Sequence, residues 1–175
     1  MERGRSCCFT GHRPEKLPWG SDETDPRCLA LKAAIRDAVA AAYDEGFRHF
    51  ICGMARGCDL YFAEAVVDLR RERPDVTLEA AIPCPTQSQA WPAAERARWR
   101  TLVEQSDYET LVQERYTPDC MLRRNRYMVD HSSLVIAVYD GAGGGTRRTL
   151  EYAIARRVPF VDIHPEGGGR HFCRA

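Results

Sequence analysis

The sequence has no surplus of either charge: 25 Lys and Arg residues balance 25 Asp and Glu residues in a chain of 175. Proteins that coat nucleic acid or an anionic membrane carry a basic surplus, so we expect neither as a partner. No stretch approaches the roughly 18 apolar residues of a membrane span. No apolar core of a secretion signal stands near the start. These absences predict a soluble, cytoplasmic protein.

No cysteine belongs to a CxxC pair, although the chain has eight cysteines. The usual ligand spacing of a zinc site is therefore missing, and we predict no metal. Several cysteines stand in short apolar runs, where a reduced thiol acts as a small buried hydrophobic side chain. The sequence thus predicts eight reduced cysteines, with Cys7 or Cys8, and also Cys52, buried.

Neither standard phosphate-binding motif is present, because no GK[ST] follows a glycine loop and no GxGxxG occurs. Internal repeats, low-complexity segments and domain linkers are missing as well. A chain of this length fits one domain of ordinary size. We therefore predict a single domain over residues 1–175, with a loosely ordered tail at 165–175.

Short apolar runs alternate with longer helical patterns along the chain. The clearest helix begins at Pro26, after the N-cap residue Asp25, and carries one apolar stripe from Leu31 onward. The clearest strand, 133–139, is apolar without alternation, as in a strand covered on both faces. Further strands are predicted at 7–10, 49–52, 76–82, 108–112 and 160–163, and further helices end near 71, 105, 131 and 157.

This alternation indicates an α/β protein with a Rossmann-like, doubly wound three-layer sandwich and a mainly parallel sheet. Ligands of such folds bind beyond the carboxyl ends of the strands. Three glycine-bearing loops fall at those ends, and they hold most of the candidate residues.

The first loop contains Gly11, His12 and Arg13, directly after the first predicted strand. A glycine at this point lets the chain turn sharply and lets a ligand approach the main chain. The Arg13 guanidinium suits bidentate pairing with a phosphate, and the His12 imidazole suits phosphate binding or proton transfer. The alternative is an ordinary strand-end turn with an exposed arginine.

The second loop, 52–59, carries two glycines just before a helix. Free N–H groups at a helix start, together with the positive end of the helix dipole, bind anions. Asp59 suits either a helix cap or a ribose hydroxyl, and capping alone is the alternative explanation of the loop. The predicted ligand-binding residues here are Gly53, Ala55, Arg56, Gly57 and Asp59.

The third loop has three consecutive glycines, which are entropically costly in a mere connector. Thr146 is predicted to cap the next helix, so that the glycine run and the helix start form a phosphate cradle. Asp140, at the strand end, is placed for a sugar hydroxyl. A solvated basic face is the alternative. The predicted binding residues are Asp140, Gly143, Gly144, Gly145 and Thr146.

Two further candidates precede the clearest strand. Asn125 lies on the apolar side of its predicted helix, in line with Leu122 and Val129. It either satisfies a buried main-chain group or reaches the ligand pocket, where Arg124 is expected to join it.

Together these stretches resemble the YpsA-like branch of the SLOG superfamily, whose Rossmann-like members include the LOG phosphoribohydrolases and DprA. The matching stretches are FTGHRP at 9–14, CGMARGCD at 52–59, RNRYMVDHSSLVIAVYDG at 124–141 and GGGTRRTLEYA at 143–153. The similarity extends over residues 5–165. It implies a pocket at the strand ends for a nucleotide or an NAD-derived ligand, without a settled reaction.

The chain departs from the hydrolases of this superfamily at one position. Their GTxxE pattern carries a Glu three residues after the Thr, whereas Thr149 stands there in this chain. A threonine supplies no carboxylate for base catalysis or for stabilising an oxocarbenium ion. Glu151 is expected to face elsewhere on the helix. Whether the chain is an enzyme stays open, with His12 and Asp140 as the catalytic candidates.

The leading hypothesis is a module that binds or senses a nucleotide-type ligand, such as an NAD or ADP-ribose derivative or a nucleoside phosphate. Its phosphates would lie on the second and third loops. No cofactor is required, a protein partner would receive the signal, and a monomer and a homodimer both fit. One alternative is an N-glycosidic hydrolase of the LOG type. A second is DprA-like binding of single-stranded nucleic acid through arginines, which neutral charge and few stacking aromatics disfavour.

Overall fold

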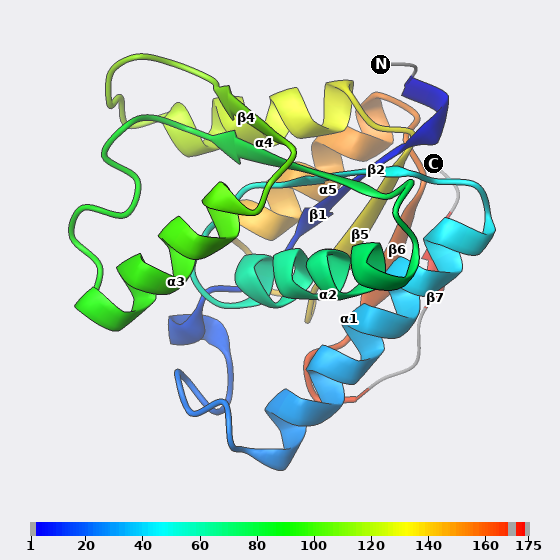
Figure 1. Ribbon diagram of the computed structural model, residues 1–175, viewed down its shortest axis with the longest axis horizontal. Coiled ribbons are helices and arrows are strands. Elements are labelled where there is room, and N and C mark those ends of the chain that lie inside the picture. The colour runs from blue at the N-terminus through cyan, green and yellow to red at the C-terminus, as the bar shows by residue number, and fades with distance from the viewer. Residues whose placement is uncertain (1–2, 168–170, 174–175) are drawn as a thin grey trace.

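The computed structural model describes residues 3–167 and 171–173. A seven-stranded sheet forms its centre, in the order β4-β3-β2-β1-β5-β6-β7 (Figure 1). Strands β1 to β6 are parallel to their neighbours, and β7 runs antiparallel to β6, so the predicted mainly parallel sheet is confirmed. The strands are β1 (Ser6–Thr10), β2 (His49–Cys52), β3 (Thr77–Ile82), β4 (Tyr108–Leu111), β5 (Leu134–Val138), β6 (Phe160–Ile163) and β7 (His171–Cys173).

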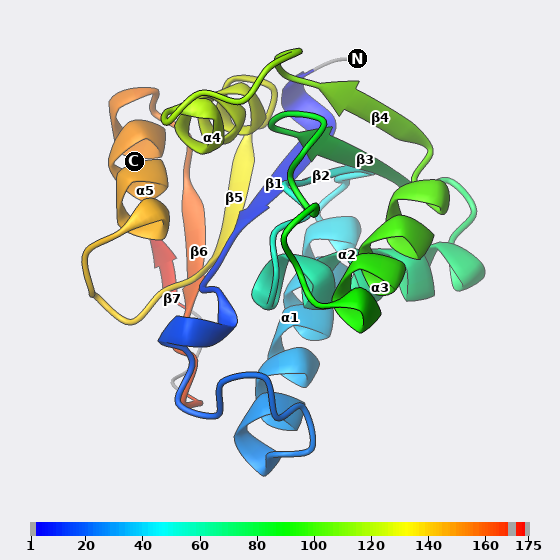
Figure 2. The same ribbon diagram turned by 90° about the vertical axis from the view of Figure 1, so that its left-hand side faces the viewer.

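Helices cover both faces of the sheet, which confirms the doubly wound three-layer arrangement. Figure 2 shows α1, α2 and α3 on one face and α4 and α5 on the other. Short 3-10 turns lie at Arg3–Arg5 and Pro14–Lys16. The helices are α1 (Pro26–Asp44), α2 (Cys58–Glu72), α3 (Ala93–Glu104), α4 (Cys120–Asp130) and α5 (Gly145–Ala155).

The central strands are apolar on both sides because each side packs on a helical layer. In β1, Phe9 faces α2 and stacks on Phe62 with ring centroids 4.6 Å apart, while Cys8 belongs to the opposite cluster with Met128. All eight cysteines are free thiols, and seven of them are buried. The predicted burial of the cysteines in the first two strands is confirmed, and the thiols fill core space as small apolar groups.

Helix α1 follows its sequence signals closely. The Asp25 carboxylate accepts a hydrogen bond from the Arg27 N–H, as an N-cap does, and Pro26 occupies the first helical position. Leu31 and Ile35 from the predicted apolar stripe are buried. This helix packs along α2, and the two helices together cover the β1 and β2 side of the sheet.

The prediction of a loosely ordered tail at 165–175 is wrong for residues 171–173, which form β7 beside β6, with His171 opposite Asp162. The remaining tail positions 168–170 and 174–175 lie outside the described residues. A strand of three residues is too short to show a period in the sequence. It forms because the outer edge of β6 offers unpaired main-chain donors and acceptors.

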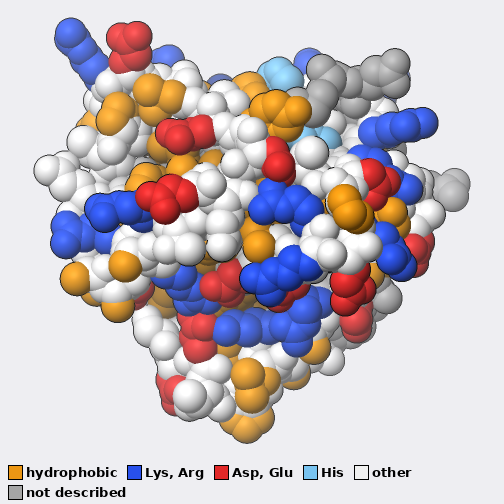
Figure 3. Space-filling model, viewed as in Figure 1, with side chains coloured by type: hydrophobic (Ala, Val, Ile, Leu, Met, Phe, Trp, Pro, Cys, Tyr) orange, Lys and Arg blue, Asp and Glu red, His pale blue; other side chains and the backbone are white. Residues whose placement is uncertain are grey.

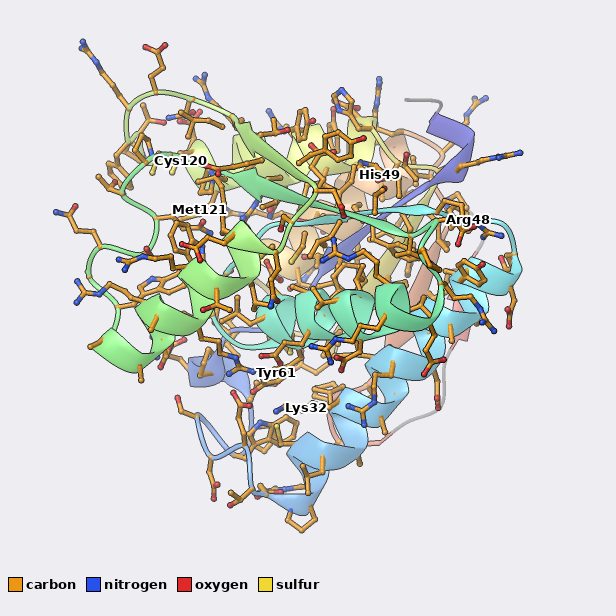
Figure 4. The ribbon with its side chains drawn as sticks, viewed as in Figure 1. Lys32, Arg48, His49, Tyr61, Cys120 and Met121 are labelled. Atoms are coloured by element: carbon orange, nitrogen blue, oxygen red, sulfur yellow. The ribbon has the colours of Figure 1, made fainter. Side chains whose placement is uncertain are left out.

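A buried polar network links strands β2, β3 and β4 to α4, and no sequence motif predicts it. The Glu79 carboxylate lies 2.7 Å from Nε2 of His49 and accepts hydrogen bonds from the hydroxyls of Thr110 and Tyr127. Figure 4 shows His49 and Arg48 at the start of β2, far from Cys120 and Met121 at the start of α4. The network therefore holds the amino end of the sheet, away from the glycine loops.

Candidate functional site

The candidate site lies where the strand order reverses, between β1 and β5. The chain leaves β1 toward β2 on one side, whereas β5 pairs with β1 on the other. Such a switch point opens a crevice at the carboxyl ends of the strands. A cavity of about 270 Å³ lies there and is called the rim pocket below. Its lining residues are Gly11, His12, Arg13, Glu15, Lys16, Ala142, Gly143, Gly144, Gly145 and Thr146.

The rim pocket opens onto the start of α5. Gly144 is the N-cap residue with a φ of 141°, and no described side chain caps this helix start. The first-turn N–H groups of a helix have no acceptor within the helix, and they carry its positive dipole end. The prediction that Thr146 is the cap is wrong: the helix already begins at Gly145, and Thr146 is buried in its first turn. The glycine run itself makes the turn into the helix.

Two cations stand beside this helix start, Arg13 and Lys16. Within the described residues, neither side chain forms an ion pair. Nζ of Lys16 donates a hydrogen bond of 2.7 Å to the main-chain oxygen of Gly143. A Cβ atom at Gly144 would lie only 2.2 Å from that nitrogen, so the third loop and Lys16 fit closely. Sequence reasoning missed Lys16, because its contact spans 127 residues along the chain.

His12 lines the rim pocket and is 3% exposed. Its Nε2 lies 2.9 Å from Oδ1 of Asp140 without meeting the geometry of a hydrogen bond. Asp140 also accepts a hydrogen bond of 2.9 Å from the Ala142 N–H. Partial burial raises the pKa of Asp140, but this hydrogen bond and His12 outweigh it and lower the pKa overall. Asp140 thus orients His12 and the turn, rather than lining the pocket.

The second loop is closed by its own contacts. The Gly53 carbonyl accepts hydrogen bonds from the Arg124 guanidinium and, at 2.9 Å, from Gln87. The Ala55 N–H donates to the Asp59 carboxylate at 3.0 Å. Asp59 therefore holds the loop before the helix, and burial raises its pKa. A ligand would have to displace these bonds to use the same groups.

The start of α2 is also occupied. The Cys58 N–H donates to the main-chain oxygen of His12 at 3.2 Å. A Cβ atom at Gly57 would lie 2.9 Å from that same oxygen, so the first and second loops pack against each other. Arg56, the predicted charge on this loop, is held by Glu95 and by Glu15, the latter at 2.8 Å. This guanidinium is already neutralised by two carboxylates.

A smaller cavity of about 90 Å³ adjoins the rim pocket and shares Gly11, Arg13, Gly145 and Thr146 with it. Arg124 and Asn125 line it, together with Asp59. Arg124 is buried, and this burial lowers the pKa of its guanidinium. Asn125 lines this cavity, and its Nδ2 donates to the Thr149 hydroxyl at 2.9 Å, so its partner is a side chain and not the main-chain group of the alternative expectation.

Thr149 has a structural task at the position where related hydrolases carry a glutamate. Its hydroxyl accepts from Asn125 and donates to the Gly145 carbonyl at 2.9 Å, so it ties α4 to the first turn of α5. Glu151 is exposed and pairs with Arg147 at 2.9 Å, which confirms that it faces elsewhere. Among the described residues that line the 90 Å³ cavity, Asp59 is the one carboxylate. It does not replace the missing glutamate, because it accepts the hydrogen bond from the Ala55 N–H of the second loop.

Comparison with known proteins decides the family of this chain. The family model described as the YspA SLOG family matches residues 7–158. This chain belongs to that family. The SPbeta prophage-derived protein YoqJ of Bacillus subtilis, named as uncharacterized, is 32% identical over 145 residues, covering 74% of this chain and 83% of its own. The UPF0398 protein YpsA of the same strain is 28% identical, covering 81% of this chain and 79% of its own. The resemblance seen in the sequence motifs is confirmed.

A solved structure shares the fold of this SLOG-family chain. It is that of DNA processing protein A from Helicobacter pylori, whose title describes a single-stranded DNA binding mode. The two superpose with a TM-score of 0.59 at 16% identity, over 90% of this chain and 64% of that one. This likeness concerns the fold alone. Separately, none of the helices in residues 3–167 is long and apolar enough to cross a membrane.

Proposed function

We propose that this SLOG-family protein binds a nucleotide-type ligand through a phosphate group in the rim pocket. The observation that carries the proposal is the gathering of Arg13 and Lys16 around the uncapped start of α5. The Gly143–Gly145 main chain would cradle the phosphate oxygens, the two cations would neutralise them, and the buried His12 ring would supply a further donor.

The electrostatics of the free pocket support an anionic ligand. An ammonium next to a helix N-terminus is repelled by the positive dipole end, by a few tenths to about 1 kcal/mol. Lys16 nevertheless lies there, bonded to a carbonyl of the glycine run. An anion between the helix start and the two cations converts this repulsion into attraction on both sides. Phosphate fits the geometry because it accepts hydrogen bonds from several directions at once.

The proposal is tested by calorimetry and thermal unfolding with nucleoside 5′-monophosphates. A ligand at 100 times its Kd raises the free energy of unfolding by about 2.7 kcal/mol. Arg13→Ala and Lys16→Ala should each lower the affinity about tenfold, or about 1.4 kcal/mol. Arg36→Ala, at an exposed site on α1, is the matched control and should bind as the unmodified protein does. Equal affinity in all three variants would contradict the proposal.

The two alternatives give different outcomes in the same samples. Release of free base from the monophosphate, followed by chromatography, would indicate an N-glycosidic hydrolase despite Thr149. Tighter binding of a single-stranded oligonucleotide than of any mononucleotide would indicate a DprA-like function. The face in Figure 3 does not favour the latter, because Lys and Arg side chains alternate there with Asp and Glu side chains. Arg98, for example, pairs with both Glu23 and Glu64.

A further inference from the structure

The number of phosphates that the site accepts follows from how the second loop is built. A dinucleotide or a nucleoside diphosphate needs a second anion position next to the first. The sequence predicts this position on the loop of Gly53 and Gly57, at the start of α2. Three of the main-chain N–H groups that would bind it, those of Met54, Ala55 and Cys58, already have acceptors.

The acceptors at this loop are themselves fixed. Asp59, which binds the Ala55 N–H, is 5% exposed, and the His12 carbonyl that binds Cys58 belongs to the first loop. Replacing either by a phosphate would leave a buried acceptor without a donor, which costs about 1–3 kcal/mol. The contact of Gly57 with His12 and Pro14 also leaves no gap at the start of α2 itself.

Charge disfavours a second phosphate at the same place. Arg56 faces the carboxylates of Glu15 and Glu95, so this group of three carries one net negative charge. In the adjoining 90 Å³ cavity, the Arg124 guanidinium is opposed by the nearby Asp59 carboxylate. The first place carries a net negative charge, and the small cavity has a positive surplus only through Arg13, which it shares with the rim pocket.

The rim pocket, in contrast, has the charge for one phosphate. Arg13 and Lys16 supply two positive charges without an ion pair in the described part of the chain, and the Glu15 carboxylate, which also lines the pocket, is paired with Arg56. A terminal phosphate monoester carries about −1.5 to −2 charges near neutral pH. Two cations and one helix start therefore match one such group.

Resting on the proposed function, we infer that the ligand is a nucleoside monophosphate or a related sugar monophosphate, and that diphosphates and dinucleotides are excluded. The single phosphate binds at the start of α5. The rest of the ligand extends over Gly11 and Arg13, which line both cavities, toward the small cavity. The NAD and ADP-ribose derivatives considered from the sequence have no place for their second phosphate.

The inference is tested by calorimetry with AMP, ADP and ADP-ribose, and with the guanine and cytosine 5′-mono- and diphosphates. The monophosphates should bind at least tenfold more tightly than the matching diphosphates and than ADP-ribose. Lys16→Ala should lower the monophosphate affinity about tenfold. Arg56→Gln should leave it within twofold, because Arg56 is committed to Glu15 and Glu95.

Two failures are distinguishable. Tighter binding of ADP or ADP-ribose than of AMP, with a loss in Arg56→Gln, would overturn the single-phosphate inference and keep the proposed function. Absence of binding for every nucleotide in the panel would overturn the proposed function and the inference with it. Circular dichroism of each variant confirms that a loss of affinity is not a loss of fold.

Discussion

Two glycine-bearing loops follow β2 and β5, the strands on either side of β1 in the same sheet, and they use their glycines in opposite ways. In the loop after β2, the glycines let other groups come close: the Arg124 guanidinium lies against Gly53, and the His12 carbonyl against Gly57. In the loop after β5, Gly143 and Gly145 have no atom within 4 Å of where a Cβ would lie, and Gly144 is approached only by the flexible Lys16 side chain. One loop is packed and the other is open, although both end at a helix start.

This difference shows that a glycine before a helix does not by itself indicate an anion site. The test is whether the amides of the helix start already have acceptors. Neither helix start has a side-chain cap in the described residues, but at α2 the Cys58 amide has the His12 carbonyl of the first loop as its acceptor. Among the described residues, no main-chain oxygen accepts from the Gly145 or Thr146 amide at the start of α5. The predictions below are ordered by the size of the expected effect, and each compares a residue of the packed loop with one of the open loop.

Gly53→Ala should be the most destabilising substitution in either loop. Its Cβ would lie 2.4–2.5 Å from the Arg124 guanidinium, which is buried and cannot swing into solvent. We expect a loss of about 3 kcal/mol in the free energy of unfolding, from overpacking and a weakened buried hydrogen bond. Gly143→Ala is the control and should change it by less than about 0.5 kcal/mol. Urea unfolding measures both, and equal losses would remove the distinction between the loops.

Thr149→Val should cause the next largest loss of stability, because Thr149 links α4 to the first turn of α5, next to the open loop. The substitution removes a hydroxyl that serves Asn125 and the Gly145 carbonyl, while the shape of the side chain is kept. Leaving the Asn125 amide without its acceptor should cost about 1–2 kcal/mol. Thr149→Ser, which keeps the hydroxyl, should recover most of this loss. A valine variant as stable as the unmodified protein would show that the link between α4 and α5 carries no energy.

Arg56→Gln should affect mainly stability, and Lys16→Gln should affect mainly phosphate binding. Arg56 lies between two carboxylates at a half-buried position, so its loss should lower the free energy of unfolding by about 1 kcal/mol or less. Lys16→Gln should leave stability nearly unchanged and weaken phosphate binding instead. Thermal unfolding with and without inorganic phosphate measures both quantities. A reversed pattern would mean that the packed loop is the anion site.

The smallest expected effect concerns two aspartates, one from each loop, whose contributions to stability change with pH in opposite directions. The folded pKa of Asp140 is lowered, so its contribution to stability is present above about pH 3.8 and is lost as the pH falls below it. The folded pKa of Asp59 is raised by burial, so its contribution is present below about pH 3.8 and is lost as the pH rises. Asp140→Asn should therefore flatten the acid-side decline in stability, measured by urea unfolding between about pH 2 and 5. A steeper decline in this variant would contradict the assigned sign.

The architecture was predictable from local pattern, because each strand and helix carries its own signal. The uniformly apolar residues of β5 and the N-cap Asp25 of α1 need no knowledge of distant residues. The positions of Gly11 and the Gly143–Gly145 run on one pocket followed from parallel topology alone. The N-cap of α5 was misplaced by two residues, because the glycine N-cap Gly144 gives no side-chain signal.

The state of each loop was not predictable, because it depends on partners far away in the chain. Arg56 is neutralised by Glu95, which lies 39 residues further on, and Gly53 is covered by Arg124, 71 residues further on. The sequence shows that Arg56 is charged, but it does not show that two carboxylates form ion pairs with it. Lys16 went unnoticed for the converse reason, since its target in the open loop lacks any charge.

The bond between Lys16 and Gly143 also has a consequence for how the site comes into being. The rim pocket is made of one segment near residue 12 and another near residue 144, so it does not exist while only one of them has folded. During synthesis on the ribosome the first segment emerges well before the second. Strand β1 likewise cannot complete its pairing until β5 has been synthesised. A ligand in this pocket would bind only after the central sheet has closed. Its binding energy would then oppose complete unfolding of the domain rather than the fraying of one loop.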